Sequence, residues 1–312
     1  MGIAELLLDP NMQWILLATM LLGMSSGVLG SFAYLRKQSL MGDALSHAAL
    51  PGVCIAFLLT GTKSLWLFML GAAAAGAVAT FGIGFITRHS RIKTDAALAI
   101  VLSAFFGLGI MLLTRIQQSG SGSQAGLDKF LFGQAASMIQ SDVYTMAGLA
   151  AFLIAVCALF FKQFKLISFD AEFARMIGYK TAALEQFLML LLVIAVVVGI
   201  QAVGVVLMAS MLITPAVAAR YWTDRLGVMV VLAGAFGALG GAIGTLFSAA
   251  ANRLPTGPLA VLAVTGVFVV SVLFAPKRGL VAKRLLRARV KRDLEREQSA
   301  RIGSAKKEVS AS

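Results

Sequence analysis

The sequence predicts an all-α protein, a polytopic membrane bundle of about nine transmembrane helices. Of its 312 residues, 59% are hydrophobic and only 13% are charged, whereas soluble domains carry nearer a quarter charged residues. Apolar runs of about twenty residues recur along the chain, which is the length of a membrane-spanning helix. Because these runs lack the alternation of barrel strands, and only helices or closed barrels can span lipid, the helical class follows.

Breaks marked by charge, glycine or proline divide the chain into candidate spans. A transmembrane domain over residues 1–276 precedes a basic tail over 277–312. The segment 183–221 contains no polar loop, so one long broken helix is an alternative to two spans there. The predicted spans are 13–35, 44–60, 65–87, 96–114, 141–161, 183–201, 203–221, 226–249 and 257–275.

Basic residues predict the orientation. Most Lys and Arg residues of the loops fall on one side if the N-terminus lies outside, and cytoplasmic loops are the ones enriched in these residues. The tail after Ala275 adds more Lys and Arg than acids. A basic tail after a membrane span is more typical of a cytoplasmic topology signal than of a nucleic-acid site. Because no basic residue precedes the first apolar run, we expect no cleavable signal peptide.

An aspartate and a histidine lie four residues apart within an apolar stretch. Asp43 and His47 would share one helix face near the start of the second span, and ionisable residues inside lipid are costly. A carboxylate and an imidazole at this spacing can bind a divalent metal, hold two helices together or relay protons. Ser46 adds a hydroxyl beside them. Cys54 falls near the same face and is interpreted as a packed thiol rather than a soft ligand.

Small residues recur at four-residue spacing in two spans. Residues 23–30 read GMSSGVLG and residues 237–244 read GALGGAIG. Such spacing lets helices approach closely, since lipid provides no hydrophobic drive for their association. It predicts tight packing and says nothing about a substrate.

The segment 162–185 predicts a short amphipathic helix with Phe169, Phe173, Met176 and Ile177 on one side and Gly178 at its end. An apolar face outside the spans indicates either a partner protein or the membrane interface. The chain contains no Gly-Lys dipeptide, so it has no phosphate-binding loop of the ATPase type. If this protein drives transport, another polypeptide hydrolyses the ATP, and the chain itself is not an enzyme.

The stretch GVLGSFAYLRKQSLMGDALSHAALPGVCIAFLL (27–59) resembles the permease subunits of bacterial ABC importers for manganese, zinc or iron. The resemblance continues in order through FLFGQAAS, FDAEFARMIGY, VGVVLMASMLITPAVAARYW and LPTGPLAVL. It implies that Asp43 and His47 are the metal ligands of the translocation path. It also implies a coupling helix at about 168–179 that docks into the ATPase, with the residues Asp170, Glu172, Ala174 and Gly178.

The same resemblance implies the partners and the location. These are a cytoplasmic ABC ATPase dimer, a second permease chain, an extracytoplasmic metal-binding lipoprotein and the lipid of the bacterial plasma membrane. No permanently bound cofactor is expected, because the metal is cargo. HAALPG and FLFGQAAS are most similar to the manganese permeases of Gram-positive bacteria, which predicts Mn²⁺, with zinc or ferrous iron as the alternative. A proton-coupled carrier is disfavoured, because no second buried carboxylate pair is evident.

Overall fold

The computed structural model describes residues 10–38, 40–61, 65–118, 140–250, 254–276 and 278–284, and within these ranges every regular element is a helix. The all-α prediction is confirmed. The long helices are α2 (Pro10–Leu35), α3 (Met41–Thr60), α4 (Leu65–His89), α5 (Thr94–Gln118), α7 (Gln140–Leu159), α10 (Thr181–Val203), α11 (Val205–Trp222), α12 (Leu226–Ala250) and α13 (Thr256–Phe274).

These long helices occupy the predicted ranges. Seven of them are long and apolar enough to cross a membrane. An eighth candidate arises if α7 and the following α8 (Phe161–Phe169), which is bent by 66° from it, form one broken span. α11, of 18 residues, is not among the candidates. The FLFGQAAS motif (130–137) lies outside the described residues.

Gly204 divides the segment in which the number of spans was uncertain. Its backbone has φ 92° and ψ 160°, a combination essentially restricted to glycine. The thioether of Met208 packs where a Cβ at Gly199 would be. In a continuous helix these two residues would be about 13 Å apart along the axis. The chain therefore turns back at Gly204, and α10 and α11 are two helices.

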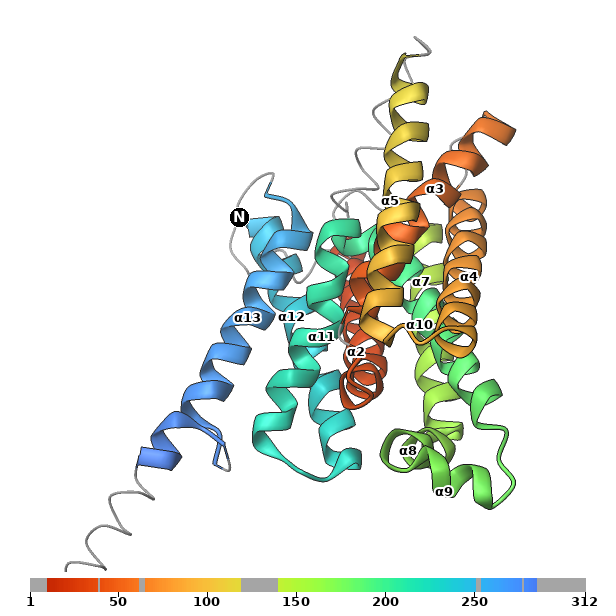
Figure 1. The fold of residues 1–312 in the computed structure, drawn as a ribbon. Helices are drawn as coiled ribbons and strands as arrows, with labels where there is room; N and C mark the ends of the chain where they lie inside the picture. Colours follow the sequence, from red (N-terminus) through yellow and green to blue (C-terminus); the bar gives the residue numbers. More distant parts are fainter. Residues whose placement is uncertain are drawn as a thin grey trace, which may run out of the picture.

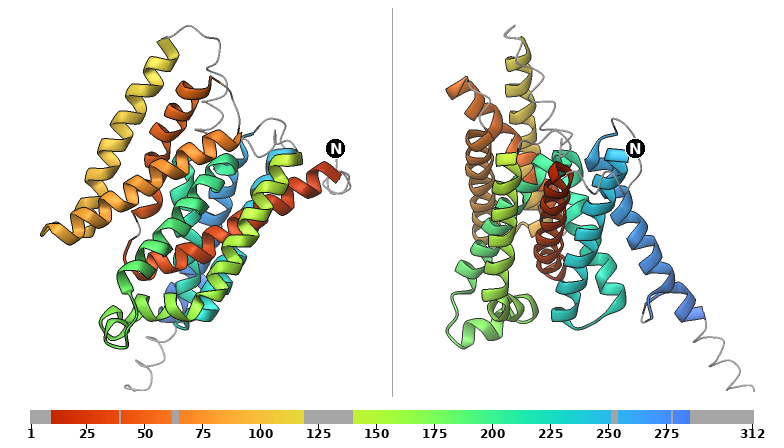
Figure 2. Two further views of the ribbon diagram at one scale, coloured as in Figure 1. Left: turned by 90° about the vertical axis from the view of Figure 1, so that its right-hand side faces the viewer. Right: turned by 180° about the vertical axis from the view of Figure 1, so that it is seen from behind.

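α2 is the central helix of the bundle. It contacts α7, α8, α10, α11 and α12, and it lies between α12 and α7 when the molecule is viewed from behind (Figure 2). In its candidate span 72% of the residues are buried, against 22% in α13, which leans away from the bundle at its far end (Figure 1). The buried core therefore runs along α2.

Glycine contacts explain how α2 packs so closely. A Cβ on Gly23 would overlap the carbonyl oxygen of Gly237, and one on Gly27 would overlap that of Ala233. Further along α12, Gly244 packs against Ala260 of α13. The predicted close approach at both glycine motifs is confirmed.

Interactions between segments that are distant in the sequence hold several helix ends together. Arg36 at the end of α2 pairs with Glu185 of α10, and an Nη2 atom of Arg88 at the end of α4 donates to the Ala182 carbonyl oxygen. We call this end of the bundle, which also includes Arg220 and Arg225, the basic end. α8 and α9 (Ala171–Met176) lie at the bottom of Figure 1, at the end of the bundle where α10 begins.

The predicted single helix over 168–179 is corrected by the structure. The helix breaks at Asp170, where φ is −148° and ψ is 88°. The Asp170 carboxylate instead accepts a hydrogen bond from the Phe173 amide at 2.8 Å, which is the geometry of an N-cap. A six-residue α9 therefore follows a separate α8, and only the predicted end at Gly178 holds.

Candidate metal-binding site

Asp43 and His47 lie on the first two turns of α3 and face each other. The His47 Nε2 atom is 3.4 Å from the Asp43 Oδ1 atom. The imidazole is 20% exposed and the carboxylate 41% exposed, so both remain reachable from outside the chain. The predicted juxtaposition on one helix face is confirmed, and its role is a separate question.

Packing on the other faces of α3 determines where this pair points. Gly42 lies against Ala209 and Leu212 of α11, and Gly52 lies against the backbone of Gly71 in α4. Leu50 fills the space beside Gly109 of α5. Three neighbouring helices therefore cover much of α3, while Asp43 and His47 in its first two turns remain partly open.

Phe106 of α5 forms one wall of the site. Its ring centroid is 4.8 Å from that of His47, and the two planes meet at 74°. The His47 Nδ1 atom is buried and has no hydrogen-bond partner within the described part of the chain. The Nε2 atom is the one that points to Asp43, and it is the nitrogen available to a metal. Sequence reasoning missed Phe106, which is 59 positions away and belongs to no polar motif.

The two neighbouring residues singled out in the sequence do not join the pair. The Ser46 hydroxyl donates to the Gly42 carbonyl oxygen of its own helix at 2.6 Å. Cys54 is fully buried, and its thiol contacts the Gly109 carbonyl oxygen at 3.9 Å. The interpretation of Cys54 as a packed thiol is supported, and neither side chain is free to bind an ion.

The pair supplies one carboxylate and one imidazole, a donor set compatible with several divalent transition metals. Among the residues that the structure describes, no group of three His, Cys, Asp or Glu side chains is placed to hold a metal. A metal on Asp43 and His47 would need water, backbone or another chain for its remaining ligands. Such weak coordination suits an ion that has to leave again.

The second predicted functional segment lies at the basic end of the bundle (Figure 1). Gly178 has φ 92°, and nothing lies within 4 Å of where its Cβ would be. The Tyr179 amide donates to the Ala174 carbonyl oxygen and the Gly178 amide to that of Arg175, which is the Schellman pattern of a helix end. Ala174 is fully buried, whereas Glu172 is exposed. Ala174 therefore anchors α9 while Asp170 and Gly178 fix its two ends.

Large apolar side chains around α9 face outward. Met176 is 78% exposed and Phe169 60% exposed, and Phe173, Ile177 and Tyr179 are also exposed. Surface hydrophobic residues are common singly, but a contiguous group indicates an interaction site.

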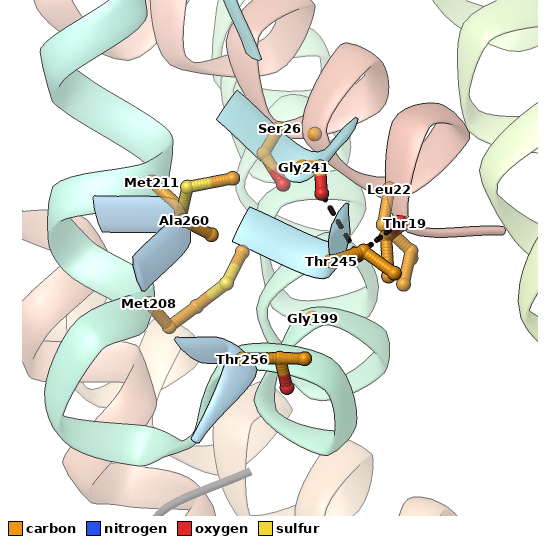
Figure 3. Close-up of a pocket in the computed structure, with 11 residues that line it drawn as sticks. Thr19, Leu22, Ser26, Gly199, Met208, Met211, Gly241, Thr245, Thr256 and Ala260 are labelled. Atoms are coloured by element: carbon orange, nitrogen blue, oxygen red, sulfur yellow. Dashed lines mark hydrogen bonds between the residues drawn. The ribbon is translucent and has the colours of Figure 1, made fainter. Parts of the chain in front are cut away.

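A small cavity separate from the pair lies among α2, α10, α11, α12 and α13 (Figure 3). Its volume is about 20 Å³, which is room for one water molecule. Thr19 and Thr245 share a 2.9 Å hydrogen bond at its edge, and Thr245 also donates to the Gly241 carbonyl oxygen. Met208 and Met211 line another side (Figure 3). The Thr19 and Thr245 hydroxyls are thus bonded, whereas the Thr256 hydroxyl is buried without a partner among the described residues.

The chain is similar to known membrane transport proteins. Residues 8–275 match the ABC 3 transport family. The chain is 56% identical to the manganese transport system membrane protein MntC of Bacillus subtilis over 93% of its own length, and it spans 66% of that relative. It is 46% identical to the zinc transport system membrane protein TroC of Treponema pallidum, covering 93% of this chain and 97% of TroC.

A solved structure extends the likeness to the fold. The structure of PsaBC from Streptococcus pneumoniae in complex with Fab contains a chain 34% identical to this one, with a TM-score of 0.77. The match covers 88% of this chain and 96% of that one. The likeness thus spans most of the chain. The chain belongs to the ABC 3 transport family.

Proposed function

We propose that this chain is the membrane subunit of an ATP-driven importer of divalent manganese, and that Asp43 and His47 bind the ion during its passage. The observation that carries this proposal is the pair itself, a carboxylate and an imidazole 3.4 Å apart and partly open on α3. Family membership makes the chain a multi-pass membrane subunit of a bacterial ABC transporter, a noncatalytic permease. The identity of the ion and the roles of the residues are the proposed part.

Manganese is favoured over zinc by the relatives and not by the donor set. The B. subtilis relative is named for manganese and the T. pallidum relative for zinc, at 56% and 46% identity. Oxygen and imidazole nitrogen suit both ions, and zinc has the higher intrinsic affinity. Selection of manganese therefore has to come from geometry or from the protein that delivers the ion. Zinc is the second candidate for the same path.

The two ends of the bundle indicate where the other proteins of the importer bind. The basic end is cytoplasmic in this proposal, since Lys and Arg concentrate on the inner side of membrane proteins. α9, with its exposed Met176 and Phe173, docks into a cytoplasmic ATPase dimer. A second permease chain would complete the path and the coordination of the ion, and an extracytoplasmic lipoprotein would deliver it.

Ion uptake by cells tests the proposal directly. Cells without their own manganese and zinc importers would express this chain with its cognate ATPase and delivery protein, and total cell metals would be measured by elemental analysis. We expect manganese to rise with the wild type and not with Asp43→Ala or His47→Ala, at equal amounts of protein in the membrane. Ser46→Ala is the matched control, because Ser46 is on the same turn but bonds its own helix.

Three results would each change the assignment differently. A rise in zinc instead of manganese, still dependent on His47, would retain the path and correct the ion. Uptake that persists in both Asp43→Ala and His47→Ala would leave the pair a structural hydrogen bond. A requirement for a proton gradient instead of ATP would favour a proton-coupled carrier, which the lack of any buried Asp or Glu among the described residues disfavours.

A further inference from the structure

Two arginines at the basic end hold the first turns of α10. Arg36 Nη2 is 2.8 Å from Glu185 Oε1, with the two side chains 12% and 30% exposed. From another helix, Arg88 Nη2 donates to the Ala182 carbonyl oxygen at 3.3 Å. Arg36 directly follows α2 and Arg88 lies at the end of α4, the two helices that precede and follow α3 in the chain. α3 is the helix that carries Asp43 and His47.

The connection from α9 to Glu185 is short and bonded throughout. Only residues 177–180 separate α9 from α10. The amides of residues 177–179 bond back to α9, and the Thr181 amide donates to the Tyr179 carbonyl oxygen. α9 and α10 are also in direct contact. A displacement of α9 is therefore passed to the start of α10.

The connection from Arg36 to Asp43 is equally short. The Gln38 amide donates to Ala33 and the Lys37 amide to Tyr34, so α2 ends in a Schellman pattern. The Met41 amide then donates to the Gln38 carbonyl oxygen. Asp43 follows in the first turn of α3. Arg36 and Asp43 are thus only seven residues apart, with the end of α2 and the start of α3 both hydrogen-bonded.

The burial of Arg36 makes its ion pair with Glu185 costly to separate. Its Nη1 atom is buried and has no partner within the described residues, so Glu185 is the acid that neutralises it. Separating a largely buried ion pair leaves an uncompensated charge, which is far more costly than breaking an exposed pair. The two ends of the pair will therefore move together.

We propose that the Arg36–Glu185 ion pair is the strut that transmits movement of α9 to the metal-binding turn of α3, with Arg88 as a second attachment. The proposal rests on the proposed function for the roles of α9 and of Asp43 with His47. Arg36 and Glu185 are positioning residues, since neither touches the ion. Their loss would uncouple ATP hydrolysis from transport without preventing assembly.

Spin-label distances test the strut without reference to which ion is carried. Labels on cysteines placed at Leu40 and Lys180 would report the separation of α3 and α10, and the native Cys54 and Cys157 are buried and stay unlabelled. In the assembled transporter we expect this separation to be the same with and without ATP, while that between Lys180 and Arg225 changes. In the permease alone, Glu185→Gln should broaden the Leu40–Lys180 distribution. A constant Lys180–Arg225 distance together with a changing Leu40–Lys180 distance would overturn the strut.

Charge exchange tests its part in transport. Arg36→Glu and Glu185→Arg should each lower uptake about tenfold or more, with ATP hydrolysis no longer stimulated by the metal-loaded delivery protein. The double exchange Arg36→Glu/Glu185→Arg should restore the stimulation. Asp224→Asn breaks the exposed ion pair with Arg278 at the same end of the bundle. This variant should change neither metal uptake nor the stimulation of ATP hydrolysis. Wild-type coupling in Glu185→Gln, or a well-assembled double exchange that recovers nothing, would contradict the proposal. If the wild type itself imports no metal, the proposed function fails and the distance measurement still decides the strut.

Discussion

The His47 imidazole and the Asp43 carboxylate meet across one turn of α3, with Nε2 and Oδ1 3.4 Å apart. At this distance the two groups interact loosely, and an ion placed between them would contact both. Since Ser46 and Cys54 are occupied elsewhere, the affinity of the site rests on these two side chains.

Removal of the negative charge from the pair should weaken metal binding. Asp43→Asn keeps the size of the side chain and replaces one oxygen ligand by an amide. Changes even in residues behind a metal ligand cost about 10–100-fold in affinity, so we expect at least about tenfold weaker Mn²⁺ binding, measured by electron paramagnetic resonance of the purified transporter. Asp95→Asn is the control, because Asp95 is also in the first turn of a helix and is exposed. Equal affinities of Asp43→Asn and the wild type would remove Asp43 from the site.

A methyl group at Gly23 should force α2 away from α12. Its Cβ would overlap the Gly237 carbonyl oxygen, which is backbone and cannot rotate away. Overpacking of this kind costs about 1–3 kcal/mol, so Gly23→Ala should lower the melting temperature of the detergent-solubilised protein. Gly148→Ala on α7 has open space within 4 Å and should leave the melting temperature unchanged or slightly higher. If both variants melt alike, the close α2–α12 contact is not a stabilising one.

Lys37 adopts a conformation that suits glycine better. Its φ is 57°, and it occupies the position in the Schellman pattern of α2 that Gly178 occupies in that of α9. The left-handed conformation costs an L-residue about 1–2 kcal/mol. Lys37→Gly should therefore raise the stability by up to about 1 kcal/mol, part of the gain being offset by the entropy of glycine in the unfolded chain. Lys37→Ala keeps the strain and is the control, and an equal gain in both variants would mean that the lysine side chain is responsible.

Much of this architecture could be predicted from the sequence, because membrane helices follow from local composition. Apolar runs located the long helices, and the four-residue spacing of Asp43 and His47 required nothing but helical geometry. The glycine spacing in 237–244 predicted close packing in the same way. The break of the amphipathic segment at Asp170 was missed, although an aspartate three residues before the Phe173 amide it caps is a local signal.

The relationships that escaped prediction join distant positions. Phe106 reaches His47, and Glu185 reaches Arg36, only after the bundle has formed. No periodicity within one helix specifies which helix will lie beside it. The turn at Gly204 was ambiguous for a related reason, since a glycine in an apolar run is compatible with both a bend and an uninterrupted helix.

Strain at Gly178 should loosen α9. Because φ is 92° and the surrounding space is open, Gly178→Ala introduces backbone strain of about 1 kcal/mol without a clash. We expect less ATPase to co-purify with this variant. Gly227→Ala is the control, because Gly227 lies within helix α12, where the nearest atom to its Cβ would be 3.9 Å away. Equal recovery of ATPase with both variants would show that docking does not need the helix end at Gly178.

A charge on the exposed face of α9 should disrupt docking without disturbing the fold. Met176 is 78% exposed, so Met176→Asp leaves the bundle intact but would place an unpaired carboxylate in the apolar contact with the ATPase. Burial of an unpaired charge is strongly unfavourable, and we expect at least about tenfold weaker association, or about 1.4 kcal/mol. Leu280→Asp is the control, because Leu280 is 51% exposed and lies after α13, outside α9. The measurement is titration of the purified ATPase against each variant in lipid nanodiscs. If Met176→Asp binds the ATPase as the wild type does, the apolar face of α9 lies on the membrane interface and a different surface receives the ATPase.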